Sequence, residues 1–304
     1  MSVIQASELG RFYGPVVGLS DLTVEVPPGI TGLLGPNGAG KSTFLKLVVG
    51  ELRPSRGQIQ VLGETPFANR ALYRRLGFAP QQDALYEHLT GRGFVELVLR
   101  LGGFGRQEAR QRATRALERV GMGDAMERRC AGYSKGMRQR TKLAQAIAHE
   151  PELLVLDEPL TGLDPMGRRQ MIRLFGELGQ QGTAILVSSH VLHEVQALTE
   201  QVLLLHRGRL LAQGPVAEIR ALLDRHPRRV EIRAREPRRL AEQLVRREEV
   251  QSLELDGEQL RLRTDDLPTL LRALTPLAAE AQVGLRSIES PDAGLEAVFD
   301  YLVG

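Results

Sequence analysis

Two short segments, Leu153–Leu156 and Ala184–Val187, consist only of apolar residues. Strands that are apolar on both faces are typical of parallel strands buried inside an α/β sheet. The stretch between them, Pro165–Gln180, has the pattern of a helix. This order predicts a β-α-β unit with parallel strands at the centre of the fold.

The residues around this unit divide into regions of different pattern. Residues 1 to about 75 read mainly as strands separated by turns, whereas the pattern from about Thr90 to Ala148 is helical, with arginine-rich and glutamate-rich faces. The segment Gln201–Gly214 has the pattern of a hairpin. We therefore predict an α/β domain over residues 1–214, with a mixed sheet core and a helical subdomain at about residues 85–150.

A second, smaller domain is predicted over residues 230–304, after a linker at residues 215–229 that contains the sequence DRHPRR. Its strands and helices follow the order βαββαβ, which predicts a small α/β sandwich of the ferredoxin-like type, closed by a last helix at Leu295–Leu302. The predicted elements before that helix are Val230–Ala234, Arg238–Arg247, Gln251–Leu255, Gln259–Arg263, Leu267–Ala281 and Gly284–Ile288.

A glycine-rich segment, GPNGAGKST, follows the predicted strand Ile30–Leu34. Its spacing is that of a phosphate-binding loop: glycine, four residues, glycine, lysine, then serine or threonine. The glycines let successive N–H groups point at a phosphate chain, Lys41 supplies a positive charge, and the Ser42 hydroxyl is suited to bind Mg²⁺. The other reading, a glycine-rich turn that matches by chance, predicts no ligand. We predict nucleoside triphosphate binding by Gly35, Pro36, Asn37, Gly38, Ala39, Gly40, Lys41, Ser42 and Thr43.

Two acidic residues, Asp157 and Glu158, follow the apolar strand Leu153–Leu156. The carboxyl ends of strands are where α/β sheets bind ligands. Asp157 is therefore predicted to bind Mg²⁺, and Glu158 to act as the general base on the attacking water. An acidic loop that only caps the next helix is the alternative for this pair.

Charge and cysteine content narrow the range of partners. The chain has 40 basic and 37 acidic residues, a formal net charge of +3, and no long run of like charge, so we predict no nucleic-acid partner. No apolar run approaches the ~18 residues of a membrane span, and the N-terminal residues do not have the pattern of a signal peptide. The single cysteine, Cys130, fits a reducing compartment.

The order of motifs resembles the ATP-binding subunit of an ABC transporter over residues 1–214. The resemblance depends on the phosphate-binding loop, on the Asp-Glu pair and on four further motifs. These motifs are Pro80-Gln81, Tyr133–Met137 (YSKGM), Gly162-Leu163-Asp164 and Ser188-Ser189-His190. The usual family signature is LSGGQ, and the form found here is similar to that of exporter ATPases.

The resemblance implies a role for several single residues. Tyr13 would stack on the adenine, and His190 would contact the γ-phosphate and order the attacking water. Gln81, with Gln82 as the competing choice, would join the Mg²⁺ shell and sense the γ-phosphate. Asp164 would couple two active sites across a dimer.

The signature residues Ser134 and Gly136 are implied to bind the ATP of a second copy of the chain. ATP would then join two subunits head to tail, and hydrolysis would release them.

The resemblance therefore implies an ATP-hydrolysing subunit of an ABC exporter, with Mg²⁺ as cofactor. Two copies would dock on a separate integral membrane permease, at the cytoplasmic face of the membrane. The ending Gly294–Phe299 is similar to that of such exporter ATPases. The alternative is a soluble ABC ATPase without a transport role, for example of the assembly-scaffold type. The transported substrate, the identity of the permease and the role of the C-terminal domain are not encoded in these motifs.

Overall fold

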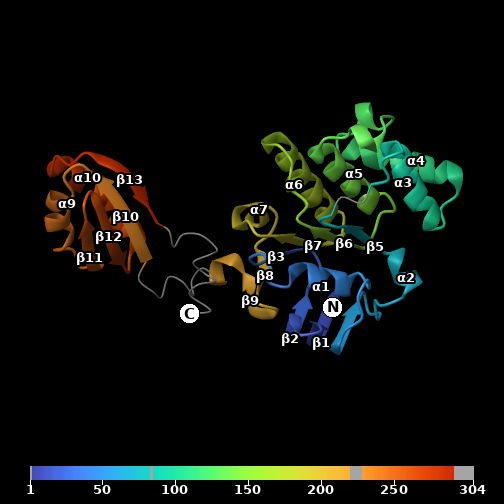
Figure 1. Cartoon of the computed structure of the whole chain (residues 1–304), viewed down its shortest axis with the longest axis horizontal. Helices are drawn as coiled ribbons and strands as arrows, with labels where there is room; N and C mark the ends of the chain where they lie inside the picture. The colour runs from blue at the N-terminus through green and yellow to red at the C-terminus, as the bar shows by residue number, and fades with distance from the viewer. Residues whose placement is uncertain (1, 83–84, 220–227, 291–304) are drawn as a thin grey trace. The chain divides into compact units, whose positions relative to one another are not determined.

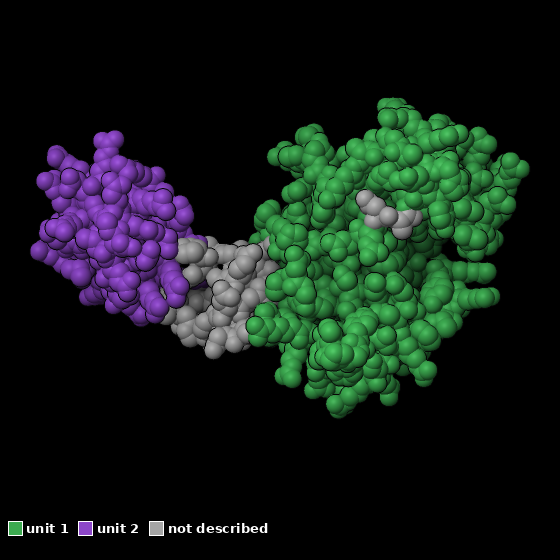
Figure 2. Space-filling view, in the orientation of Figure 1, with its two compact units in different colours: residues 1–215 green, residues 216–304 purple. Residues whose placement is uncertain are grey.

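The computed structural model describes residues 2–82, 85–219 and 228–290 of the chain (Figure 1). The chain folds as two compact units, residues 1–215 and residues 216–304, which Figure 2 colours separately. The strands of the first unit are β1 (Ile4–Tyr13), β2 (Val16–Val26), β3 (Ile30–Leu34), β4 (Arg56–Val61), β5 (Leu76–Ala79), β6 (Leu153–Asp157), β7 (Ala184–Ser189), β8 (Gln201–His206) and β9 (Arg209–Pro215). Its helices are α1 (Lys41–Val48), α2 (Arg70–Tyr73), α3 (Gly91–Leu101), α4 (Arg106–Arg119), α5 (Lys135–Ile147), α6 (Pro165–Gln180) and α7 (Leu192–Gln196), with 3₁₀ turns η1 (Gly123–Ala125) and η2 (Cys130–Gly132).

Two sheets organise the first unit. The six-stranded sheet has the order β5-β6-β7-β3-β8-β9, in which β9 pairs antiparallel with β8 and the other neighbours are parallel. The three-stranded sheet β2-β1-β4 is antiparallel. The two predicted apolar strands are β6 and β7, which lie side by side and parallel, so the predicted β-α-β unit and mixed sheet are confirmed.

The larger sheet is buried on both faces, as its apolar strands predict. Leu153 and Val155 of β6 belong to a core shared with α1 and the three-stranded sheet. Leu154 and Leu156, which point to the opposite face, belong to a core shared with α3, α4, α5 and α6. Figure 1 shows the same arrangement, with α1 on one side of the sheet and these four helices on the other.

Local sequence explains where individual helices begin. The helix α6 has the predicted bounds, since the side chain of Asp164 accepts a hydrogen bond from Gly167 N (3.1 Å) and Pro165 occupies the first helical position. The short helix α2 lies in a region that the sequence predicted mainly as strands. It forms because Asn69 Oδ1 accepts hydrogen bonds from the first-turn amides of Ala71 and Leu72.

The second unit has the elements β10 (Arg228–Ala234), α9 (Pro237–Leu244), β11 (Val250–Asp256), β12 (Gln259–Thr264), α10 (Leu267–Glu280) and β13 (Leu285–Glu289). These strands form an antiparallel sheet of order β11-β12-β10-β13, whose buried residues, such as Ile232 and Leu262, pack against Leu240 of α9 and Leu274 of α10. The order βαββαβ is the predicted one. The helix predicted at Leu295–Leu302 lies outside the described residues.

Candidate functional site

The loop between β3 and α1 has backbone conformations that need glycine. Gly38 has a φ of 80° and Gly40 a φ of 102°, both in the left-handed region. A Cβ atom at Gly40 would lie 2.7 Å from Gly18 O, which is closer than Cβ atoms approach an oxygen in real structures. The loop therefore depends on glycine both for its turn and for its close packing, and it leads directly into the N-terminus of α1.

Lys41 is the buried cation of this loop. Its side chain is 7% exposed, and Nζ donates hydrogen bonds to Gly35 O (2.6 Å) and Pro36 O (3.3 Å). The pKa of Lys41 lies below its ordinary value because burial disfavours the ammonium, while the charges of Glu158 and Asp157 act in the opposite direction. A phosphate group in the loop would add negative charge beside Nζ and so favour the charged form.

The Asp157-Glu158 pair is held by the neighbouring strand. Ser188, at the carboxyl end of β7, donates a hydrogen bond to Asp157 Oδ1 (2.6 Å), and its Oγ accepts one from Glu158 N (2.9 Å). All three residues are buried. The sequence included Ser188 in the motif Ser188-Ser189-His190 but predicted no role for it. The signal that could have identified it is a hydroxyl residue that ends an otherwise apolar strand.

The carboxylate of Glu158 lies between the side chains of Lys41 and His190. One carboxylate oxygen, Oε1, is 3.7 Å from Lys41 Nζ, and the other, Oε2, is 2.9 Å from His190 Nδ1. Glu158 is 6% exposed, whereas the His190 side chain is 51% exposed. The backbone of Glu158 has a φ of 51°, which is uncommon for a residue with a side chain.

Most of these residues line one cavity of about 520 Å³. The predicted site residues that line it are Tyr13, Gln81, Asp157, Glu158 and the loop residues Pro36, Asn37, Gly38, Ala39, Gly40, Lys41, Ser42 and Thr43. Of the two competing glutamines, only Gln81 is among the lining residues. Val16, Val17 and Gly18 also line the cavity and were not predicted. Val16 and Val17 are exposed apolar side chains beside Tyr13, so they would give a planar base a hydrophobic surface.

Five further predicted residues lie outside the cavity lining. Gly35 begins the loop, and His190 reaches the site through Glu158. Ser134 is the exposed N-cap of α5, where its Oγ accepts a hydrogen bond from Met137 N (3.3 Å). Gly136 follows in the first turn, and a Cβ there would lie 3.3 Å from Gly162 O. The signature therefore packs beside the loop that leads to Asp164, which is exposed and caps α6.

The donors at the cavity suit Mg²⁺. Ser42, Gln81 and Asp157 offer a hydroxyl, an amide and a carboxylate oxygen, and Mg²⁺ binds through few protein oxygens together with substrate phosphates. Within the described residues, no group of three or more His, Cys, Asp and Glu is placed to hold a metal ion. The oxygen donors at the cavity thus fit a magnesium that binds together with the phosphates of a nucleotide. In the described part of the chain, no helix is both long enough and apolar enough to span a membrane.

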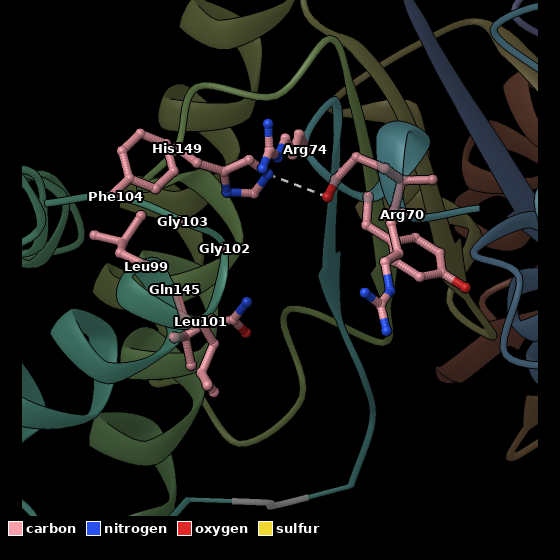
Figure 3. Close-up of a pocket in the computed structure, with 12 residues that line it drawn as sticks. Arg70, Arg74, Leu99, Leu101, Gly102, Gly103, Phe104, Gln145 and His149 are labelled. Atoms are coloured by element: carbon pink, nitrogen blue, oxygen red, sulfur yellow. Dashed lines mark hydrogen bonds between the residues drawn. The ribbon is translucent and has the colours of Figure 1, made fainter. Parts of the chain in front are cut away.

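A second cavity, of about 530 Å³, lies between the sheet core and the helical subdomain (Figure 3). Its walls come from α2, the start of β5, the end of α3 and the end of α5. Within it, His149 Nε2 lies 3.1 Å from Leu76 O, the contact that is dashed in Figure 3. The lining residues are Arg70, Tyr73, Arg74, Leu76, Val98, Leu99, Leu101, Gly102, Gly103, Phe104, Gln145 and His149.

Acid is expected to destabilise the first unit through His149. Its pKa lies below the ordinary 6.5, mainly because burial disfavours the charged ring. The unfolded chain therefore binds this proton at a higher pH than the folded chain, so stability is retained above about pH 6.5 and falls as the pH drops below it. The free energy of unfolding should fall by at most about 1.4 kcal/mol per pH unit through this group.

The measurement is urea unfolding at about pH 7.5 and about pH 5.5. The difference in the free energy of unfolding between the two pH values should be smaller for His149→Gln than for the wild type, because glutamine has no titrating ring and its amide can still donate to Leu76 O. An unchanged difference would assign the acid sensitivity to another group.

Comparison with known proteins agrees with the fold and the loop. The family model for ABC transporters matches residues 19–161. An ABC transporter ATP-binding protein of Nostoc sp. is 40% identical over 228 residues, 72% of this chain and 68% of the relative. The daunorubicin/doxorubicin resistance ATP-binding protein DrrA of Streptomyces peucetius is 33% identical over 305 residues, 99% of this chain and 92% of the relative. The bacitracin transport ATP-binding protein BcrA of Bacillus licheniformis is 36% identical over 217 residues, 70% of each protein.

Solved structures agree as well. The ATP binding subunit of an ABC transporter superposes with a TM-score of 0.67 at 29% identity, over 73% of this chain and 93% of that one. The fold and the phosphate-binding loop define a P-loop ATPase cassette. The chain belongs to the ABC transporter family, as one of its ATP-binding proteins. The predicted cassette fold, ATP binding and ATPase activity are thereby confirmed.

Proposed function

We propose that this chain hydrolyses ATP to drive export through a separate membrane-spanning permease, and that two copies close on ATP during each cycle. The observation that carries the proposal is the placement of the signature. Ser134 is exposed at the N-terminus of α5 and does not line the cavity that joins the phosphate-binding loop, Gln81 and Glu158. A helix N-terminus with an exposed serine as its N-cap is suited to bind phosphate, so a second copy would complete the site.

The proposed chemistry assigns each step to residues of this chain. The loop amides and Lys41 bind the phosphates, and the exposed Tyr13 ring stacks on the adenine. Glu158 accepts the proton of the attacking water, while His190, 2.9 Å from Glu158 Oε2, orders that water beside the γ-phosphate. Ser42, Gln81 and Asp157 would hold Mg²⁺, which supplies positive charge to the β- and γ-phosphate oxygens.

The direction of transport is supported by the relatives. DrrA is an ATP-binding protein of daunorubicin/doxorubicin resistance, and BcrA is an ATP-binding protein of bacitracin transport. The alignment with DrrA covers 99% of this chain, including the second unit. We propose export for this chain on the same basis. A soluble ABC ATPase without a transport role is not favoured. The exporter-like ending Gly294–Phe299 lies outside the described residues. A permease in trans implies a peripheral position at the cytoplasmic face of the membrane.

The cavity of Figure 3 is the proposed docking site for a cytoplasmic segment of the permease. Tyr73 (42% exposed) and Leu101 (79% exposed) present apolar surface there, next to the guanidinium groups of Arg70 and Arg74. This combination fits a segment with apolar and acidic side chains. Because the walls come from both the sheet core and the helical subdomain, a segment bound there would respond to movement between them.

Leu101→Arg is expected to reduce recovery of the permease by about tenfold or more, since it places a charge in an apolar contact. The measurement is a gentle-detergent pull-down of the tagged full-length chain from its native membranes, read by mass spectrometry. Val245→Arg, at another exposed apolar residue (67%), is the control and should recover the permease normally. Normal recovery with Leu101→Arg would contradict the docking site. Recovery of only soluble partners with the unchanged chain would contradict the export function itself.

A further inference from the structure

Lys142 is a buried lysine in the signature helix, and its charged end reaches the glutamine loop. It lies on α5, about two turns after Ser134, and its side chain is 3% exposed. Nζ donates hydrogen bonds to Pro80 O (3.0 Å), Gln81 O (3.0 Å) and Gln82 O (3.3 Å). The proposed function gives no role to this residue.

The three contacts constrain the backbone around Gln81. An ammonium has three N–H groups, and here three successive carbonyls point at it. Burying such a charge is costly unless it is hydrogen-bonded, so the lysine and the loop are stable together in this arrangement. Because the carbonyls on both sides of Gln81 are directed toward Nζ, the orientation of the peptide planes that carry the Gln81 side chain is fixed. That side chain lines the nucleotide cavity.

The same helix also holds the turn after the Asp-Glu pair. Gln139, less than one turn before Lys142 and buried, donates a hydrogen bond from Nε2 to Pro159 O (2.9 Å). The helix α5 therefore begins at the serine that is proposed to meet a second copy, and it contacts both the loop of Gln81 and the turn after Glu158. A displacement of α5 would move the backbone at Gln81 and at Pro159 together.

We infer that Lys142 is a positioning residue that holds Gln81 in the nucleotide cavity and links this glutamine to the signature helix. The inference rests on the proposed role of Gln81 at the Mg²⁺ and γ-phosphate. When α5 moves on contact with a second copy, the hydrogen bonds from Lys142 carry that movement to Gln81.

The test is Lys142→Met in the full-length chain, because methionine keeps an unbranched side chain and removes the charge and the donors. We expect kcat to fall about tenfold or more, since misplacement of a catalytic group is costly. The Mg²⁺ concentration for half-maximal activity should rise several-fold, while ATP binding without Mg²⁺ stays unchanged. Lys142→Arg, which retains a cation and donors, should lie closer to the wild type in its Mg²⁺ response.

A double-mutant cycle with Gln81→Ala separates the inference from the proposed function. If Lys142 acts through Gln81, then adding Lys142→Met to Gln81→Ala should change kcat by less than about twofold. A full additional loss would overturn the inference and leave the role of Gln81 intact. A Gln81→Ala variant with normal activity and normal Mg²⁺ response would instead contradict the proposed role of Gln81.

Leu143→Ala is the control for general loss of stability. Leu143 is the next residue of α5, is fully buried, and belongs to the apolar core shared by the helices and the sheet. We expect a lower Tm and an unchanged Mg²⁺ response for this variant. Hydrogen exchange at Gln81 and Gln82 should become faster in Lys142→Met and stay at the wild-type rate in Leu143→Ala. Equal changes in both variants would show that Lys142 has only a packing role.

Discussion

Glu158→Gln is expected to bind ATP normally and to lose most of its turnover. Removal of a general base typically lowers the rate by about 10²–10⁴-fold. The amide of glutamine can keep the hydrogen-bonding contact with His190, which lies 2.9 Å from the carboxylate, but it loses the charge that faces Lys41 Nζ at 3.7 Å. The amide also cannot accept the proton of the water. Because binding is retained and hydrolysis is not, the ATP-bound dimer should accumulate.

The measurements are kcat, nucleotide affinity and size-exclusion chromatography with ATP and Mg²⁺. Glu150→Gln is a matched control, because Glu150 also has a left-handed backbone (φ 57°), but its side chain is 70% exposed and paired with Arg112. This control should keep normal activity and remain in the wild-type monomer–dimer equilibrium. A monomeric, fully active Glu158→Gln protein would mean that another group is the base.

Ser134→Arg is expected to stop hydrolysis without impairing nucleotide binding by the single chain. Ser134 is exposed and outside its own nucleotide cavity, so the larger side chain has room in the monomer and would obstruct only a second copy. We expect a loss of activity of at least about tenfold, which corresponds to about 1.4 kcal/mol. The fold should lose only about 1 kcal/mol, because a helix N-cap is removed.

Ser134→Ala separates the two causes, since it removes the same N-cap without adding bulk. Its ATP-dependent dimer should still form, and its activity should lie between those of the wild type and of Ser134→Arg. Dimerisation is measured by light scattering in the presence of ATP, with Glu158→Gln as the background in both variants. Normal hydrolysis by Ser134→Arg would contradict the site shared between two copies.

Local sequence was sufficient to predict the structure of a segment wherever that segment carries its own structural signal. The apolar segments of β6 and β7, the capped helix α6 and the glycine pattern of Gly35–Thr43 are as predicted, because burial, capping and left-handed glycines act over a few residues. The predicted order of elements in the second unit holds for the same reason. The short helix α2 was missed, because its stability comes from one asparagine cap rather than from a periodic pattern.

The contacts that arrange the site join residues far apart in the sequence, and no local pattern reports them. Ser188 binds Asp157 from the next strand along the chain, which its sequence position alone does not indicate. Val16 and Val17 look like ordinary strand residues until the folded chain places them beside the phosphate-binding loop. Of the two neighbouring glutamines, the sequence favoured Gln81, and Gln81 is the one that lines the cavity.

The sequence by itself therefore determined the class of fold, the nucleotide and the residues with suitable chemistry, since these follow from short motifs. Only the tertiary structure decided which of them meet in one cavity and which side chains hold them there. The physical reason is that a buried charge such as Lys142 or Glu158 is stable only with partners within hydrogen-bonding distance. Those partners come from other strands and helices, so their identity is set by packing.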